Sequence, residues 1–430
     1  MDSSIRRVRQ EYGPSGVLYD LGSVYEGLLK LTDVRKAKGK IYSLDAILMI
    51  IVLAKLCGVD SPYAIADWAK NHQMQLVELL QLKRPNTLKG RRALPSHHTI
   101  RRIMGRVVYE EEVERFVAAY NETGEHGEVY AMVGQEPTTL DGKAIRGIRK
   151  KDEEGSDYLL SLYDVEQAKV MSQVAVGRKE NEITKAPEAL KNVKISQKII
   201  TGDALHTQKS ISAQIISQGG DYVFPARCSG LLPVKENQLR LYQNIQQLFA
   251  PEYPDWKEQS LRKPGFGKIQ MDFLTTQKVS KGHGRLETRI LTTSEMLNPY
   301  STWPGLAQVY RLERQFQWWR SGRCYHTSNE VEFGITSLSR MTASPARLLK
   351  IRREHWGIET GLHYRRDVTF HEDATRMTVG PTGHVMASIN NLVIALTRQA
   401  KFKNIAQARR WFAAHIPEAF SLLTTPYSLS

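Results

Sequence analysis

The sequence predicts an α/β protein in which a mixed β-sheet is preceded by an α-helical N-terminal region and interrupted by a β-rich insertion. Three observations lead to this class. Apolar residues recur at helical spacing in the first 120 residues, short strand-like runs begin near residue 128, and helix-like stretches alternate with the last of these runs. Residues 240–342 then hold five prolines and four of the seven tryptophans, which marks a distinct segment.

Composition argues against several classes of protein. The chain has 430 residues, with 60 Lys and Arg against 45 Asp and Glu and a net charge of +15. Its longest apolar run, 46–54, is far shorter than the roughly 20 residues of a membrane span, and the N-terminus lacks a signal-peptide pattern. Three widely spaced cysteines argue against a disulfide framework and a CxxC zinc site. We therefore expect a cytoplasmic protein without a membrane segment, whose partner is a polyanion.

The positive charge is concentrated in two stretches that contain no acid. Residues 83–106 hold eight basic side chains, and residues 374–417 hold six. One such stretch alone is compatible with a solvated surface. Because both occur in one chain, we expect contacts with the phosphates of a polyanion.

The helical N-terminal region is predicted to be a DNA-binding domain over residues 1–125. Ser43 caps an expected helix over the apolar run, and Ser96 begins another. The apolar stripe of this second helix consists of Ile100, Ile103 and Val107. Arg101 and Arg102 lie on its outer side, as in the second helix of a helix-turn-helix, so they are candidates for DNA contact. A plain surface helix is the alternative.

Residues 126–240 and 343–400 are predicted to form the domain with the mixed sheet. The expected strands are 158–165, 169–176, 198–203 and 221–226, and the expected helices are 183–193 and 207–218. Strands followed by a strand–helix–strand unit indicate a mixed sheet with a crossover connection. We assign 241–342 to a β-rich insertion, in which Trp318 and Trp319 are core residues or, alternatively, stack on bases. Residues 401–430 are assigned to a helical tail.

Two aspartates follow predicted strands of this sheet. Asp141 lies in LDGK, a sequence that is also typical of a tight turn, and Asp203 ends IITGD, where an aspartate is also a good helix cap. The carboxyl ends of strands in open α/β sheets are where ligand sites gather. Both residues are therefore candidates for a shared site.

A third acid, Glu359, lies on the helix that follows Ser344. The polar face of this helix consists of Arg352, His355, Glu359, His363 and Arg366. These residues recur at spacings of three and four, so they share one side of the helix. Alone, a helical glutamate is an ordinary surface residue. With Asp141 and Asp203 it supplies three hard oxygen ligands, which suit Mg²⁺ or Mn²⁺, and two such ions support phosphodiester chemistry.

Basic side chains flank the three acids. The candidates for holding DNA phosphates are Lys143, Arg146, Arg352 and Arg366. Arginine and lysine bind phosphate oxygens by charge-assisted hydrogen bonds. His355 is expected to line the acidic site or to contact the DNA.

Two competing interpretations remain at this stage. His355, Glu359 and His363 are spaced by four, with His206 and His371 as further nitrogen ligands, which describes a zinc or iron hydrolase, although the HExxH order is missing. A DNA-binding remnant without catalytic activity would keep the charge but would not need all three acids.

Several motifs together resemble one family. They are LDGKAIRG (140–147), GRKENEI (177–183), IITGDALHTQ (199–208), SGLLPVKENQ (229–238), HGRLETRIL (283–291), FGITSLS (333–339) and REHWGIETGLHYRRDVTFHEDATR (353–376). In this order they resemble the bacterial insertion-sequence transposases with a DDE site, in the group that includes the H-repeat-associated proteins. The resemblance covers nearly the whole chain.

The resemblance implies a ribonuclease-H-like catalytic domain that cuts and joins DNA at transposon ends. It aligns Asp141, Asp203 and Glu359 with the family's metal-binding triad. It also implies double-stranded DNA as the partner, at transposon ends and at the target, and a homodimer in a synaptic complex.

The helix departs from the wider class of these transposases, whose signature is Tyr-x2-Arg-x3-Glu-x6-Lys. Arg352 stands in place of the tyrosine, His355 in place of the arginine and Arg366 in place of the lysine. Three neighbouring acids compete with Glu359 as the third ligand. They are Asp367, Glu372 and Asp373.

Overall fold

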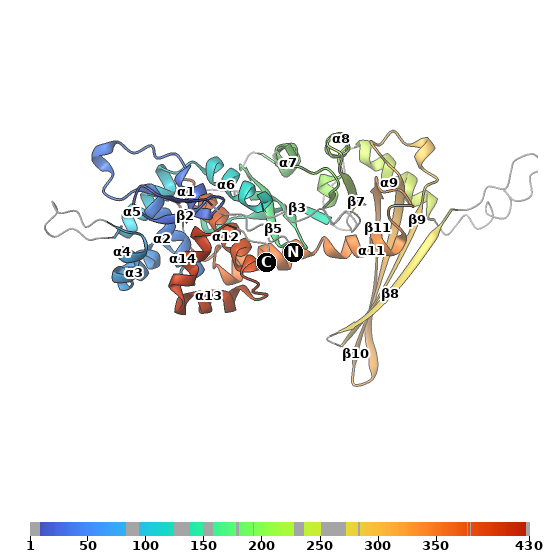
Figure 1. Ribbon diagram of the computed structural model, residues 1–430. Helices are drawn as coiled ribbons and strands as arrows, with labels where there is room; N and C mark the ends of the chain where they lie inside the picture. Colours follow the sequence, from blue (N-terminus) through green and yellow to red (C-terminus); the bar gives the residue numbers. More distant parts are fainter. Residues whose placement is uncertain are drawn as a thin grey trace, which may run out of the picture.

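The computed structural model describes residues 9–82, 94–123, 137–148, 158–177, 180–191, 193–227, 236–250, 272–282, 284–375, 377–378 and 380–426. Helices from both ends of the chain form one end of the molecule, a mixed sheet crosses its middle, and four long strands extend from the other end (Figure 1). Among the described helices, none combines the length and the apolar character that crossing a membrane requires. Residues 83–93 of the first basic stretch lie outside the described ranges.

The helical end is built around one buried helix. Its elements are β1 (Gln10–Tyr12), β2 (Leu18–Asp20), α1 (Val24–Leu29), α2 (Leu44–Leu56), α3 (Pro62–Asn71), α4 (Gln73–Leu79), α5 (His97–Arg106), α6 (Glu110–Thr123), α12 (Thr382–Gln399), α13 (Ile405–Ala414) and α14 (Ile416–Thr424). Every residue of α2 is buried, because α1, α3, α12, α13 and α14 all contact it. The C-terminal helices therefore share the hydrophobic core of the N-terminal helices.

Helix α5 has the predicted start and the predicted buried face. The Ser96 hydroxyl accepts a hydrogen bond from the Thr99 backbone N–H at 3.4 Å, which caps the first turn. Ile100 and Ile103 are fully buried, whereas Arg101 and Arg102 are exposed. The prediction of an amphipathic helix with two outward arginines is confirmed, and their contact with DNA stays a prediction.

The sheet has nine strands in the order β5-β4-β3-β6-β7-β11-β10-β9-β8. They are β3 (Pro137–Ala144), β4 (Tyr158–Asp164), β5 (Lys169–Val176), β6 (Ile199–Gly202), β7 (Asp221–Arg227), β8 (Leu274–Gly282), β9 (Arg285–Ser294), β10 (Gln308–Arg320) and β11 (Arg323–Thr336). β3, β6 and β7 run parallel, and all other pairs are antiparallel. The four predicted strands correspond to β4, β5, β6 and β7, and the predicted mixed sheet is confirmed.

Several helices pack against this sheet, among them α7 (Glu182–Lys191), α8 (Lys209–Ser217) and α9 (Glu236–Leu248). Of these, α7 and α8 match the two predicted helices. Short 3-10 turns lie at Ala37–Gly39, Arg146–Ile148, Ala204–His206 and Asn298–Tyr300. A second hydrophobic core forms between the sheet and these helices, with Leu140, Ile200 and Trp303 among its buried side chains.

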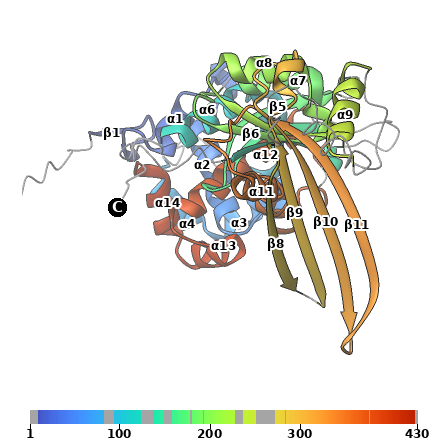
Figure 2. The same ribbon diagram turned by 90° about the vertical axis from the view of Figure 1, so that its right-hand side faces the viewer.

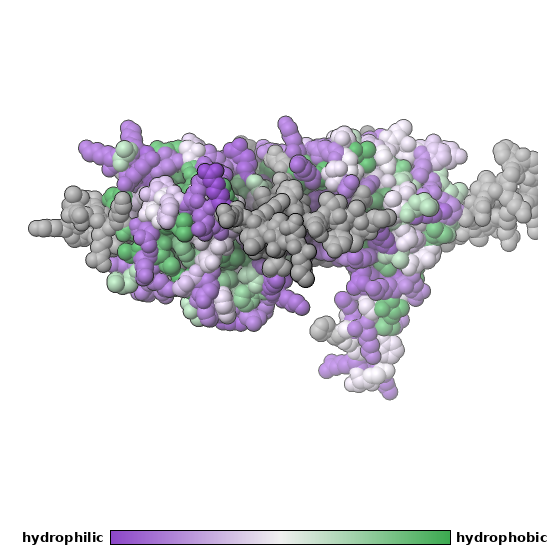
Figure 3. Space-filling model, in the orientation of Figure 1, coloured by the Kyte–Doolittle hydropathy of each residue, from purple (hydrophilic) through white to green (hydrophobic). Residues whose placement is uncertain are grey.

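The strands β8–β11 extend the central sheet and then leave the body as a curved arm (Figure 2). They join the sheet because β11 pairs with β7. Hydrophilic side chains cover most of the arm that faces the viewer in Figure 3. Trp319 lies on this arm with 44% of its surface exposed, so the expectation that it is a core residue is wrong; the far end of the arm has no second layer to bury it. Trp318 is half-buried against the ring of His326.

The helix that carries Glu359 begins as predicted and then changes its winding. α11 (Pro345–Glu354) is capped by the Ser344 side chain and has proline in its first turn. Two π-helical turns follow, Glu359–His363 and Arg365–Thr369. Wider turns of this kind are common at functional sites.

Candidate active site

The two aspartates lie side by side because their strands are parallel neighbours. Leu140 of β3 pairs with Gly202 of β6, so the next residues, Asp141 and Asp203, lie level with each other. Asp203 follows the end of β6, as predicted. The prediction that Asp141 follows its strand is wrong, and LDGK does not form a tight turn, because β3 continues to Ala144 in pairing with β4. Adjacent strands lie about 4.8 Å apart. The Asp141 side chain is 14% exposed, whereas that of Asp203 is 58% exposed. The pairing therefore brings together two acids that are far apart in the sequence.

Glu359 approaches the same place from the π-helical segment. Its carboxylate lies 3.4 Å from Nδ1 of His363, and that nitrogen lies 3.6 Å from the Asp141 carboxylate. Ligand atoms of Asp141, Glu359 and His363 all lie within 4.8 Å of one another. A glycine permits this approach: a Cβ at Gly361 would lie 2.6 Å from the hydroxyl of Tyr163 on β4.

A fourth acid, Glu182, adjoins the cluster and was missed in the sequence analysis. It begins α7, and a Cβ at Gly142 would collide with its carboxylate, so the glycine beside Asp141 makes room for it. Nε2 of His206 lies 3.5 Å from the Glu182 carboxylate. The sequence contained a signal, because Glu182 is the second glutamate of GRKENEI, but nothing in that motif assigns it to the sheet.

The four carboxylates perturb one another electrostatically. Burial raises the pKa of Asp141 to about 8, with the negative charges of Asp203, Glu359 and Glu182 adding to the effect. Burial and the charge of Asp203 also raise the pKa of Glu182. The pKa of Asp203 is lowered, chiefly by its hydrogen bond with His355. The raised pKa values of Asp141 and Glu182 show that the negative charges of the cluster are not fully neutralised by neighbouring basic side chains.

His355 connects the acidic cluster to the neighbouring strand. Its Nε2 lies 3.3 Å from the Asp203 carboxylate, and its Nδ1 lies 3.1 Å from the hydroxyl of Thr201 on β6. The ring is buried, which lowers the pKa of His355. Of the two expectations for His355, its position in the acidic site is the one this geometry favours.

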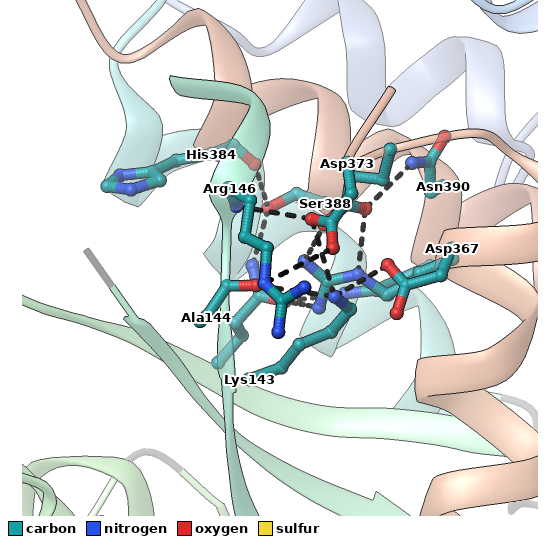
Figure 4. A network of polar contacts seen from close by, with 12 residues as sticks. Lys143, Ala144, Arg146, Asp367, Asp373, His384, Ser388 and Asn390 are labelled. Carbon is teal, nitrogen blue, oxygen red and sulfur yellow. Dashed lines mark hydrogen bonds and ion pairs between the residues drawn. The ribbon is translucent and has the colours of Figure 1, made fainter. Parts of the chain in front are cut away.

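Three of the four predicted phosphate-binding cations are buried in ion pairs within the protein. The Lys143 ammonium lies 2.6 Å from Asp367 and 3.7 Å from Asp373 (Figure 4), and Arg352 forms two hydrogen bonds with Glu332. Arg366 is fully buried and forms two hydrogen bonds with Glu372. The expectation that these three face DNA is therefore not met in this structure.

Arg146 also has an acidic partner, since its Nε lies 4.0 Å from the Asp373 carboxylate, but its side chain is 78% exposed at the surface. The ion pairs of Lys143 and Arg366 also hold the three acids that compete with Glu359 as the third ligand. Asp367 and Asp373 pair with Lys143, and Glu372 pairs with Arg366, whereas Glu359 lies beside Asp141.

The geometry does not assemble the zinc site considered from the sequence. The group of described residues that could share one ion contains His363 and Glu359 with Asp141, and His355 is not part of it. His206 lies beside Glu182, and His371 lies 3.6 Å from Asp60 in the helical end. A set dominated by carboxylates favours a hard divalent cation over zinc.

Carboxylates clustered around two neighbouring parallel strands define a site of the class that binds hard divalent metals. Comparison with known families identifies the chain more closely. Residues 134–390 match the family described as transposase DDE domain, and residues 25–120 match the family described as DDE_Tnp_1-associated. The first match covers more than half of the chain, so this protein belongs to the DDE transposase family, and the resemblance identified from its motifs is confirmed.

Individual relatives agree with this assignment. The chain is 27% identical over 387 residues to "Putative transposase YncI" of Escherichia coli O157:H7, covering 88% of both chains. It is 25% identical over 390 residues to "H repeat-associated putative transposase YhhI" of Escherichia coli K12, covering 89% of this chain and 93% of that protein. A piggyBac transposase from a synaptic complex with hairpin DNA is similar at a TM-score of 0.36 and 11% identity, over 93% of this chain and 78% of that one, which is too distant to carry an argument.

Proposed function

We propose that this chain binds the terminal inverted repeats of an insertion sequence and performs divalent-metal-dependent DNA cleavage and strand transfer. The observation that carries the proposal is the proximity of two acids to Asp141: Asp203 lies beside it on the neighbouring strand, and ligand atoms of Glu359 and Asp141 lie within 4.8 Å of each other. Membership of the transposase DDE family supports it. The triad of metal-binding residues is then Asp141, Asp203 and Glu359.

A ribonuclease-H-like fold for the catalytic domain belongs to the same proposal. The order β5-β4-β3-β6-β7, with three antiparallel strands followed by two parallel ones, supports it. We propose four regions: a DNA-binding domain (1–125), the catalytic domain (126–240 and 343–400), the insertion (241–342) and the tail (401–430). The arm formed by β8–β11 belongs to the insertion.

The residues at the site fit a divalent cation. Asp141 is largely buried among three other carboxylates. Among the described residues, His363 is the one basic side chain within ion-pair distance of Asp141. Burial lowers the pKa of His363 to about 3, which favours its neutral form. When bound, Mg²⁺ or Mn²⁺, as one or two ions, activates a water or a 3′-hydroxyl and stabilises the leaving oxygen. The protein's own contribution is to hold Asp141 rigidly on a strand, Asp203 against His355, and Glu359 beside His363.

The DNA-contacting residues that we retain are exposed in the structure. Arg101 and Arg102 lie on the outer side of α5, and Arg146 follows β3, the strand that contains Asp141. Double-stranded DNA at transposon ends and target sites is the proposed partner, in a synaptic complex of two copies of the chain. Action on chromosomal DNA would bring the protein to the nucleoid.

The test is a cleavage and strand-transfer assay on the DNA ends of the element that encodes this chain, with and without Mg²⁺. We expect Asp203→Ala and Glu359→Ala to abolish both reactions and to keep DNA binding. Glu188→Gln, an exposed acid of α7, is the matched control and should react like the parent protein. If both alanine variants cut as well as the parent, the triad is wrong. If the parent itself binds these ends without cutting them under any divalent metal, the protein is a DNA-binding remnant.

A further inference from the structure

A deep cleft lies between the helix that carries Glu359 and helix α13, away from the acidic cluster. It has a volume of about 670 Å³. Thr360, Tyr364 and Arg365 line one wall, and Lys403, Asn404 and Arg410 line the other. We call this space the α13 cleft. Helix α13 lies at the lower edge of the helical end in Figure 1, on the opposite edge from α7.

The lining of the α13 cleft is entirely without acids. Its ionisable side chains are Cys57, Tyr364, Arg365, His371, Lys403, Arg409 and Arg410. The other arginine-rich pocket of the described protein, at the base of the arm, contains Glu287 and Glu332, which pair with its arginines. The α13 cleft therefore has an uncompensated positive charge that the arm pocket lacks.

The cations of the cleft divide into structural and available ones. Arg409 is structural, because it forms an ion pair with Asp60 at 2.6 Å and a hydrogen bond to the Lys55 carbonyl. Lys403 and Arg410 are exposed, and neither forms an ion pair with any residue that the structure describes. They remain available to a ligand.

Arg365 is the third cation of the cleft. Its side chain lines the cleft, while its Nη1 is buried and has no hydrogen-bond partner within the described ranges. A buried charged donor that is left unpaired is destabilising. Because guanidinium groups bind negatively charged oxygens by short charge-assisted hydrogen bonds, a negatively charged ligand in the cleft would offset the charge of Arg365.

The remaining lining groups suit a phosphate that is part of a chain. Thr360, Tyr364 and Asn404 provide neutral hydrogen-bonding groups, and Tyr364 is 58% exposed beside the cleft. The first turn of α13 also begins here, which adds the positive end of a ten-residue helix. The opening is wide, so a polymer can pass across it.

We propose that the α13 cleft binds a backbone phosphate of double-stranded DNA, with Arg365, Lys403 and Arg410 as its ligands. This proposal rests on the proposed transposase function. Thr360 follows Glu359 directly, so a phosphate held here lies on the outer side of the helix whose inner side faces Asp141. The cleft would thus hold the duplex beside the site of cleavage without taking part in the chemistry.

The test compares Lys403→Glu/Arg410→Glu with Lys191→Glu/Lys194→Glu. All four residues are exposed, and the control pair lies on and just after α7, so both double variants change the net charge equally on opposite edges of the molecule. The probe is a fluorescently labelled DNA duplex, titrated with full-length protein between about 50 and 200 mM salt. For the cleft variant we expect the slope of log affinity against log salt to become shallower by about 0.9 for each phosphate that the protein no longer binds. One phosphate fewer corresponds to roughly eightfold weaker binding at 0.1 M salt.

The outcomes separate this proposal from the proposed function. If the parent protein binds and cuts DNA while both double variants have the same affinity and salt slope, the cleft proposal is wrong and the function stands. If the parent does not bind the duplex at all, the function itself fails. A parallel thermal melt with inorganic phosphate tests for a free-phosphate site. DNA would be overturned as the ligand if phosphate stabilised the parent and the control variant but not the cleft variant, while both double variants bound the duplex with equal affinity.

Discussion

The buried ion pair between Arg366 and Glu372 is predicted to be one of the most sensitive points of the structure. Arg366 is fully buried, and Glu372 is 4% exposed. Two hydrogen bonds join them, at 2.8 and 2.5 Å, and Asn390 donates a third to Glu372 at 3.1 Å. The pair connects the segment that carries Glu359 to α12, so it positions the third acid without touching it.

Removing one partner leaves the other charge buried and unpaired. We therefore expect Glu372→Gln to lower the free energy of unfolding by about 3–5 kcal/mol, and Arg366→Met by a similar amount. The double variant should cost less than the sum of the two, since no lone charge remains buried. Burial raises the pKa of Glu372, but the charge and hydrogen bonds of Arg366, together with Lys143 and Asn390, outweigh burial, so that the pKa of Glu372 is lowered. The stabilisation is therefore present above the unfolded pKa of about 4.3 and is lost as pH falls below it.

Urea denaturation of the parent and the three variants at neutral pH measures these costs. Lys350→Met is the control, because the pair of Lys350 with Glu354 is a surface pair of the same helical segment and should contribute less than about 1 kcal/mol. A loss for Glu372→Gln no larger than that of the control would refute the reasoning. If the variants fold, strand transfer should fall with little change in DNA affinity, since the pair does not face DNA.

Two further predictions concern the acidic site. In metal-free protein the raised pKa of Asp141 adds stability at low pH, and this stability is lost as pH rises toward about 8. Asp141→Asn should therefore raise the melting temperature relative to the parent at pH 8–9 but not near pH 4. Equal shifts of the melting temperature at the two pH values would contradict the raised pKa. Gly361→Ala places a Cβ 2.6 Å from a tyrosine hydroxyl of β4 and should push the Glu359 segment away from the sheet. We expect this variant to cleave DNA at least about tenfold more slowly. Gly282→Ala is the control and should cleave normally, because a Cβ at Gly282 has no atom within 4 Å. Comparable cleavage rates for the two alanine variants would show that this close approach is not needed.

The strands and helices around the site follow from local sequence patterns. The runs that form β4, β5, β6 and β7 are short and rich in apolar, aromatic or β-branched residues, and each lies within one or two residues of its predicted bounds. Helix α5 and the start of α11 follow from capping residues and spacing. Period and capping depend on residues a few positions apart, so the sequence contains them directly.

The partners of the charged residues could not be predicted in the same way. Lys143, Arg352 and Arg366 share the composition and spacing of phosphate-binding residues, yet each finds a carboxylate inside the protein. For Lys143 the partner is Asp367, far along the chain, and only the folded chain brings the two together. Spacing shows which face of a helix a residue occupies, but it does not show what that face meets.

The sequence by itself determined the α/β class, the position of Asp203 after its strand and the family, because these depend on local pattern and on motifs preserved in order along the chain. Tertiary structure decided that Asp141 lies inside its strand, which acid approaches Asp141, which cations stay exposed, and that Glu182 belongs to the cluster. It also decided that β8–β11 continue the central sheet and that the C-terminal helices complete the N-terminal core. The physical reason is that burial and Coulomb interactions act through space, between residues that the chain order leaves far apart.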